Sequence, residues 1–95
     1  MGGLEWDTED MALKGPFFHK IEYDKEADAI YIGLNDKPVS YTKSLDDSRY
    51  IDFDAENNPI GIELLNVSSG VTVGKLPFAE PLARILENSD IKVCA

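Results

Sequence analysis

Cysteine and histidine are almost absent from this chain, and their scarcity excludes several kinds of chemistry. Cys94 is the only cysteine and His19 the only histidine among 95 residues. One thiol forms no internal disulfide or redox pair, and one imidazole cannot supply the cluster of nitrogen and sulfur ligands that a zinc site needs. Neither side chain has a recognisable partner for nucleophilic catalysis. We therefore expect no enzymatic activity, no cofactor, and a reducing, cytoplasmic setting.

Basic residues are also few. The chain has 9 lysines and arginines against 18 aspartates and glutamates, which gives a formal net charge of −9. Nucleic-acid affinity comes largely from basic side chains that displace counterions from phosphates, so we expect no nucleic-acid partner. A strongly acidic surface most often serves solubility, and it is also suited to a basic protein partner or to divalent cations.

Long apolar runs are missing as well. No run approaches the roughly 18 to 20 residues of a membrane-spanning helix, and the first residues lack the basic and apolar regions of a signal peptide. We expect neither export nor contact with a membrane. With 43% hydrophobic and 28% charged residues, the composition is that of an ordinary globular domain.

The order of residues predicts an acidic arm followed by one β-rich domain. Residues 1–16 mix acids with glycines and are expected to form a flexible acidic arm, and residues 17–95 a single domain. From Phe18 onward, apolar and polar residues alternate with a period of two between turn-forming residues. Strands are expected at residues 18–24, 29–34, 39–45, 50–55 and 60–65.

The C-terminal third changes its pattern. After Pro77, apolar residues recur at helical spacing, at Phe78, Leu82, Ile85 and Leu86. This spacing predicts a short amphipathic helix, and a small edge strand is expected near Ile91–Val93. The predicted fold is α+β, mainly β: an antiparallel five-stranded meander with one C-terminal helix.

One helix is too narrow to cover such a sheet. Five strands span roughly 24 Å, whereas a helix is about 10 to 12 Å across. The arm, curling of the sheet or a second copy of the chain must cover the remaining apolar area, and we expect a homodimer. Ile60, Ile62 and Leu64 should face the core.

An aromatic patch is expected on the second face of the sheet. Tyr31, Tyr50 and Leu65 are out of phase with the core-facing residues, so they share the opposite face. This patch could receive the helix, a partner protein or a second subunit, and packing of the helix is the expected use. Together with Asp46 and Asp47, it forms the interaction surface that we predict.

Several carboxylates have the spacing of metal ligands. Asp52, Asp54 and Glu56 with Glu63 match an EF-hand loop in part, but Asn57 stands where that loop needs Gly and the flanks read as strands. The simpler interpretation is that these acids form turns and solvated surface. The alternative is a divalent-cation site or small metal-assisted hydrolase whose ligands would come from Asp24, Asp28, Asp52, Asp54 and Glu63.

Two spaced motifs resemble a known family. They run from Lys20 to Asp24 with Glu26 to Ile32, and from Asp52 to Asp54 with Ile60 to Leu65. They are similar to the domain of unknown function 2283, a group of short bacterial and archaeal proteins, and the resemblance covers about residues 20–66. It implies a small β-rich fold without an established activity and, because some members are encoded beside a small putative toxin, an antitoxin-like or other protein-binding role. The leading hypothesis is thus a non-enzymatic interaction module with a small basic protein partner.

Overall fold

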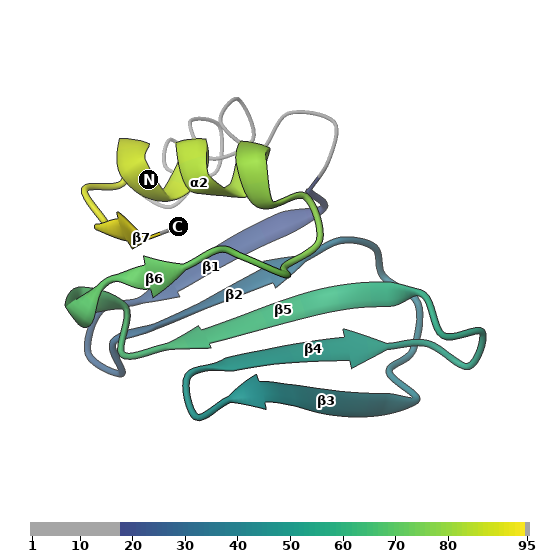
Figure 1. Ribbon diagram of the computed structural model, residues 1–95. Helices are drawn as coiled ribbons and strands as arrows, with labels where there is room; N and C mark the ends of the chain where they lie inside the picture. Colours follow the sequence, from purple (N-terminus) through teal and green to yellow (C-terminus); the bar gives the residue numbers. More distant parts are fainter. Residues whose placement is uncertain (1–17, 95) are drawn as a thin grey trace.

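The computed structural model describes residues 18–94, which form a five-stranded antiparallel sheet, a helix and a two-stranded parallel sheet (Figure 1). The arm expected over residues 1–16 lies outside the described residues. The large sheet contains β1 (Lys20–Asp24), β2 (Ala29–Gly33), β3 (Tyr41–Asp46), β4 (Arg49–Phe53) and β5 (Pro59–Leu65). The later elements are the 3-10 helix η2 (Val67–Ser69), β6 (Val71–Thr72), α2 (Ala79–Asn88) and β7 (Val93–Cys94).

The fold class expected from the sequence is confirmed, with a strand order that differs from the chain order. The sheet runs β1-β2-β5-β4-β3, because β5 pairs with both β2 and β4. A meander would keep its strands in sequential order. Alternation identifies which residues form strands, but it does not specify which strands become neighbours. Here β5 takes the central place, and the chain between β2 and β3 crosses to the far edge.

The core lies on one face of the sheet. Ile32 is opposite Ile62 in the β2–β5 register, and Ile51 is opposite Ile62 in the β4–β5 register. Ile32 and Ile62 are completely buried, and Ile60 and Leu64 are each 1% exposed, so the core positions expected in β5 are confirmed. Directly opposed β-branched residues pack well across strands, so this row holds the middle of the sheet together.

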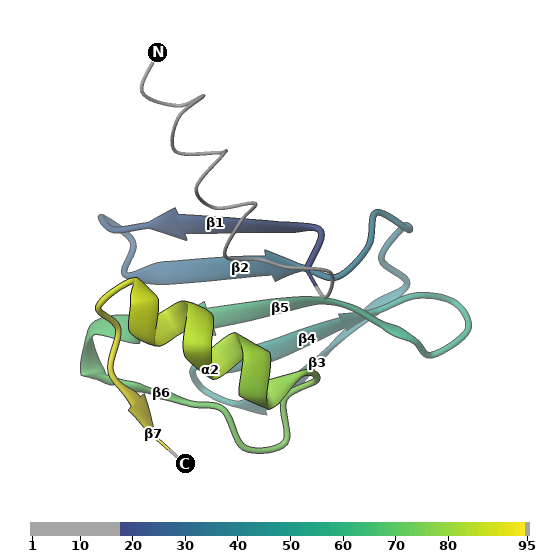
Figure 2. The ribbon, with the colours of Figure 1, turned by 90° about the horizontal axis from the view of Figure 1, so that it is seen from above.

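Helix α2 covers this same face. Leu82, Ile85 and Leu86 are buried and belong to one core cluster with the sheet isoleucines. Figure 2 shows α2 and the β6–β7 pair together on one side of the sheet. Pro81 lies in the first turn of the helix, where its missing N–H costs nothing. The expectation that the helix packs on the Tyr31 patch was wrong, because the larger apolar side chains are on the other face.

The helix leaves the β3 end of the sheet uncovered. Val39 and Tyr41 are 53% and 43% exposed, and the Tyr41 ring stacks on Phe53 with centroids 5.0 Å apart. The predicted mismatch between sheet width and helix width is therefore visible at this edge. No helix among the described residues is long and apolar enough to cross a membrane.

Two leucines of the same size allow the helix placement to be tested. Leu82→Ala should lower the free energy of unfolding by about 2–5 kcal/mol, because Leu82 is completely buried under the sheet. Leu65→Ala, on the opposite face and only half-buried, is the matched control and should cost clearly less. Urea denaturation of both variants measures the difference. Equal losses would contradict the placement of α2.

Candidate interaction face

Two tyrosines flank one glutamate on the face opposite α2. Tyr31 in β2 and Tyr50 in β4 are each directly opposite Glu63 in β5. We call this surface the open face; its residues are Glu22, Tyr31, Tyr50, Asp52, Glu63 and Leu65. Both tyrosines are half-buried and Glu63 is exposed. The predicted grouping of Tyr31, Tyr50 and Leu65 on one face is therefore present in the structure.

The Tyr31 ring lies flat across the neighbouring strand because β5 has a glycine there. A Cβ atom at Gly61 would come within 2.8 Å of the Tyr31 Cζ atom, which is too close for any real contact. The Tyr31 hydroxyl donates to Asp52 at 3.3 Å, and the Thr42 hydroxyl donates to the other oxygen of that carboxylate at 2.6 Å. Desolvation, with the nearby Asp52 charge, raises the pKa of Tyr31 above its usual value. Asp52 thus holds the ring in place.

A cationic group already lies over this ring. The Lys20 Nζ atom is 5.7 Å from the Tyr31 ring centroid and 3.8 Å from a Glu22 carboxylate oxygen. This geometry is that of a cation–π contact supported by a carboxylate. Beside it is an open hollow of about 470 Å³, whose acidic lining residues are Glu22, Asp24 and Glu63. The open face therefore offers an aromatic surface with carboxylates around it.

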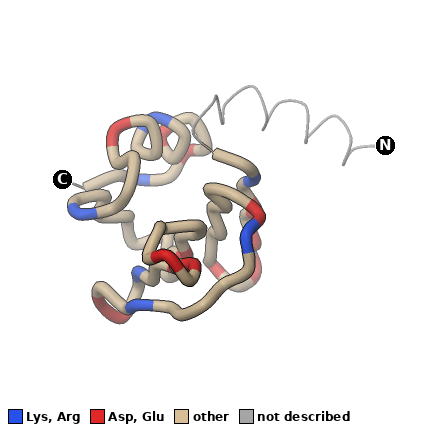
Figure 3. Tube along the Cα trace, turned by 90° about the vertical axis from the view of Figure 1, so that its right-hand side faces the viewer, with Lys and Arg blue, Asp and Glu red and all other residues tan. Residues whose placement is uncertain are grey.

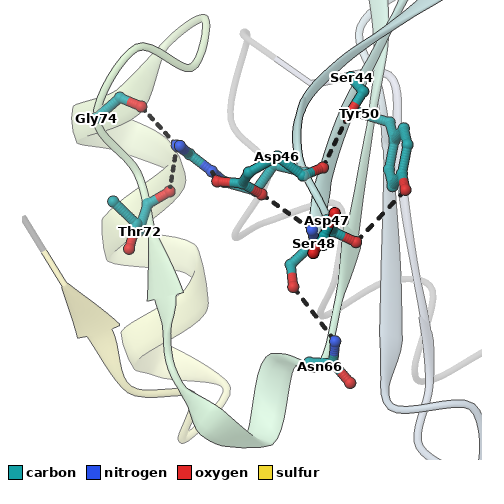
Figure 4. A network of polar contacts seen from close by, with 9 residues as sticks. Ser44, Asp46, Asp47, Ser48, Tyr50, Asn66, Thr72 and Gly74 are labelled. Carbon is teal, nitrogen blue, oxygen red and sulfur yellow. Dashed lines mark hydrogen bonds and ion pairs between the residues drawn. The ribbon is translucent and has the colours of Figure 1, made fainter.

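The predicted Asp46–Asp47 pair is at the β3–β4 turn, near Tyr50. The Tyr50 hydroxyl donates to the Asp47 carbonyl oxygen at 3.4 Å (Figure 4). Asp46 accepts from the Ser48 N–H at 2.9 Å and from the Arg49 guanidinium at 2.8 Å. Donation by Ser48, followed by that of Arg49, lowers the pKa of Asp46. Asp46 is therefore a structural acid of the turn, whereas Asp47 leaves its carboxylate exposed.

Arg49 connects this turn to the C-terminal segment. Its guanidinium donates to the carbonyl oxygens of Thr72 at 3.0 Å and of Gly74 at 2.7 Å, and its side chain is only 14% exposed (Figure 4). The fork of a guanidinium suits several acceptors at once. A hollow of about 290 Å³ opens between the turn and Gly70–Thr72. Arg49 thus ties the chain after β5 to the sheet.

The acids of the metal alternative have separate roles: Asp24, Asp28 and Asp54 accept hydrogen bonds in turns, whereas Asp52 and Glu63 are in the strands β4 and β5. Asp24 accepts from the Ala27 N–H, and Asp28 accepts from both the N–H and the hydroxyl of Ser68. Among residues 18–94, no group of three or more histidine, cysteine or acidic side chains is arranged to hold a metal ion. Figure 3 shows the acids in several separate parts of the trace, with basic residues between them. The structure does not bring the five candidate ligands together.

Asp54 differs from the solvated acid that the sequence pattern predicts. It is only 4% exposed, because its carboxylate turns back into the β4–β5 connection. One carboxylate oxygen accepts from the Glu56 N–H at 2.8 Å and from the Asn58 N–H at 2.9 Å. Donation by Asn58 is the main reason that the pKa of Asp54 is lowered, with Glu56 adding to it and desolvation opposing it. Asn57 takes a left-handed conformation in this turn, with φ of 67°.

Four residues that contribute to these sites were not identified from the sequence. The role of Arg49 could not be predicted, because it depends on carbonyl groups more than twenty residues away in the sequence. Lys20 and Glu22 belong to the first family motif, and strand phase places them on the Tyr31 face, but the sequence does not show that they form part of a site. Gly61 carried a signal in the sequence: a glycine inside a strand often marks close approach of another group.

The sequence of the sheet matches a family model. The model described as "Protein of unknown function (DUF2283)" covers residues 20–68, slightly more than half of the chain. The chain belongs to this family. The DUF2283 segment includes all five strands of the large sheet and the start of η2, whereas α2 and the β6–β7 pair follow it. No curated protein and no solved structure matches the chain significantly.

A substitution at Arg49 tests the contribution of these contacts to stability. Arg49→Ala should lower the free energy of unfolding by about 2 kcal/mol or more, because two backbone carbonyl groups and Asp46 lose a charged donor. Arg49→Lys keeps the charge but cannot reach all three acceptors, so an intermediate loss is expected. Urea denaturation measures both variants. Wild-type stability of Arg49→Ala would refute the role of the guanidinium.

The low pKa of Asp54 makes stability depend on pH. The folded chain holds this carboxyl ionised more readily than the unfolded chain does, so its contribution is present above about pH 4 and is lost as pH falls through the folded pKa. Asp54→Asn should therefore melt below the wild type at about pH 7, with a difference that shrinks toward about pH 3. Thermal melts at both pH values test this, and a difference that is constant with pH would count against it.

Proposed function

We propose that this DUF2283 chain is a non-enzymatic interaction module whose open face binds a lysine- or arginine-rich segment of another protein. The observation that carries the proposal is the position of Lys20, whose ammonium group lies over the Tyr31 ring and beside Glu22. A basic side chain of a partner would take a similar position, over a tyrosine ring and beside a carboxylate.

The charge of the open face supports a basic partner. Glu63 is exposed between the two tyrosines, and Glu22 and Asp24 line the hollow beside Tyr31. A basic side chain over a tyrosine ring can contact its face and a neighbouring carboxylate at the same time, which gives orientation as well as attraction. The net charge of −9 would also speed the approach of such a partner.

The rigidity of the open face supports the proposal further. Tyr31 is held by Asp52 and by its close approach to Gly61, and the Tyr50 hydroxyl is bonded to the turn at Asp47. Aromatic side chains that are already ordered lose little conformational entropy on binding. A small basic protein, in the manner of an antitoxin and its partner, is the class of ligand that this surface suits.

A basic peptide and its acidic counterpart test the proposal. We expect calorimetry to detect binding of an arginine–serine repeat peptide and none of a glutamate–serine peptide of equal length. Tyr31→Ala should weaken the binding about threefold or more by removing the ring. Glu63→Gln should weaken it too, whereas Glu80→Gln, which removes an equal charge from an exposed position on α2, should not.

Two results would contradict the proposal. The first is equal loss of affinity in Glu63→Gln and Glu80→Gln, which would mean that the net charge alone attracts the peptide. The second is binding that Tyr31→Ala leaves unchanged, which would remove the open face as the site.

A further inference from the structure

The edge strand β3 combines an unpaired backbone, exposed apolar side chains and a local lack of acids. It is the last strand of the sheet among the described residues. Of the three exposed large hydrophobic residues, Tyr41 begins this strand and Val39 lies two residues before it. Residues 37–45 carry two lysines and no acid, although the chain as a whole is strongly acidic. From these features we propose that β3 pairs antiparallel with β3 of a second copy, centred on Thr42.

The hydrogen-bond register shows which groups of β3 are available. The Leu65 N–H donates to the Ser48 carbonyl, so alternate residues from Ser48 direct their backbone groups toward β5. Ile51, in between, faces β3 and is opposite Lys43. Lys43 therefore directs its N–H and C=O toward β4, and Thr42 and Ser44 direct theirs outward. The Ser40 N–H already donates to the Phe53 carbonyl at 2.7 Å, so a second strand would bond the outward groups of Thr42 and Ser44.

Side-chain chemistry selects the centre of the pairing. A two-fold axis at Lys43 would set the two Lys43 side chains directly opposite each other, which is unfavourable. An axis at Thr42 instead sets Thr42 against Thr42 of the second copy and Tyr41 against its Lys43. The first is a favourable cross-strand pair and the second a cation–π contact. The irregular register between Ser44 and Asp46 disfavours an axis further along the strand.

The same register provides partners for the exposed apolar and charged residues. Where the pairing extends to the residues just before β3, Val39 comes opposite Leu45 of the second copy, which covers part of this exposed side chain. At each end, Lys37 comes near the Asp46–Asp47 turn of the second copy, so opposite charges meet. The regions of the two chains that approach are thus complementary, and the acidic open faces remain accessible.

The other edge strand, β1, offers less to a second copy. Its apolar residues Ile21 and Tyr23 are buried and half-buried under the helix side, so pairing there would cover no exposed apolar side chain. Pairing around its middle residue would also oppose Glu22 to Glu22 of the second copy. The β3 edge is therefore the better site.

Sedimentation and a backbone block test whether this edge forms the dimer. Wild-type chain should sediment as a dimer at high micromolar concentration, and more completely at about 0.5 M than at about 0.05 M salt, because salt screens the net charge. Thr42→Pro removes an outward N–H and should weaken the dimer at least about tenfold. Thr42→Val keeps that N–H and is the control, and thermal melts establish that both variants are folded.

Cross-linking tests the register itself and does not depend on the proline variant. In a Cys94→Ala background, Thr42→Cys should form an intermolecular disulfide, because directly opposed Cα atoms lie about 5.5 Å apart. Ser44→Cys should not, since its counterpart would be four residues away along the strand. A monomeric wild type, a dimer unaffected by Thr42→Pro, or equal cross-linking at both positions would each overturn the proposal.

Discussion

The packing of β5 between β2 and β4 is the constraint on which the rest of this molecule depends. Ile62 is opposed on both sides by isoleucines, and the buried leucines of α2 belong to the same core cluster as this row. Every second residue of β5 is then directed to the other face, where Gly61 admits the Tyr31 ring and Glu63 separates the two tyrosines. One strand thus supports the core and the open face at once.

The consequence is a sheet whose two faces have different uses. One face is closed by α2, and Arg49 secures the segment that leads to this helix. The other face has polar, aromatic and acidic groups, and Asp52 orders part of it by accepting hydrogen bonds from Tyr31 and Thr42, while α2 lies on the opposite side. A preformed surface of this kind loses little conformational entropy when a partner binds to it.

Much of the fold could be predicted because alternation is a local signal. Each of the five strands was found, and the burial of Ile60, Ile62 and Leu64 follows from their phase. The strand order could not be found in this way, since the long-range pairing of β5 with β2 depends on how several apolar faces fit together. The prediction of the face that α2 covers was wrong for a related reason. Tyr31 and Ile30 both fit the alternation of a strand, and only their packing against the helix shows which of the two faces is covered.

The sequence predicted which residues share the open face better than it predicted the contacts that these and neighbouring residues make. The shared face of Tyr31, Tyr50 and Leu65 follows from strand phase alone. The burial of Asp54 does not follow from strand phase. It arises because N–H groups of the β4–β5 turn donate hydrogen bonds to the Asp54 carboxylate. The role of Arg49 could not be predicted either, because its acceptors are backbone carbonyl groups of a segment that is distant in the sequence.

The most direct test of the two-faced sheet is a map of amide chemical shifts during titration with an arginine-rich peptide. The account predicts changes centred on Tyr31, Tyr50 and Glu63, with little change at Leu82 and Ile85 in α2. Changes concentrated on α2 and the β6–β7 pair, or spread evenly over all the acidic residues, would contradict it.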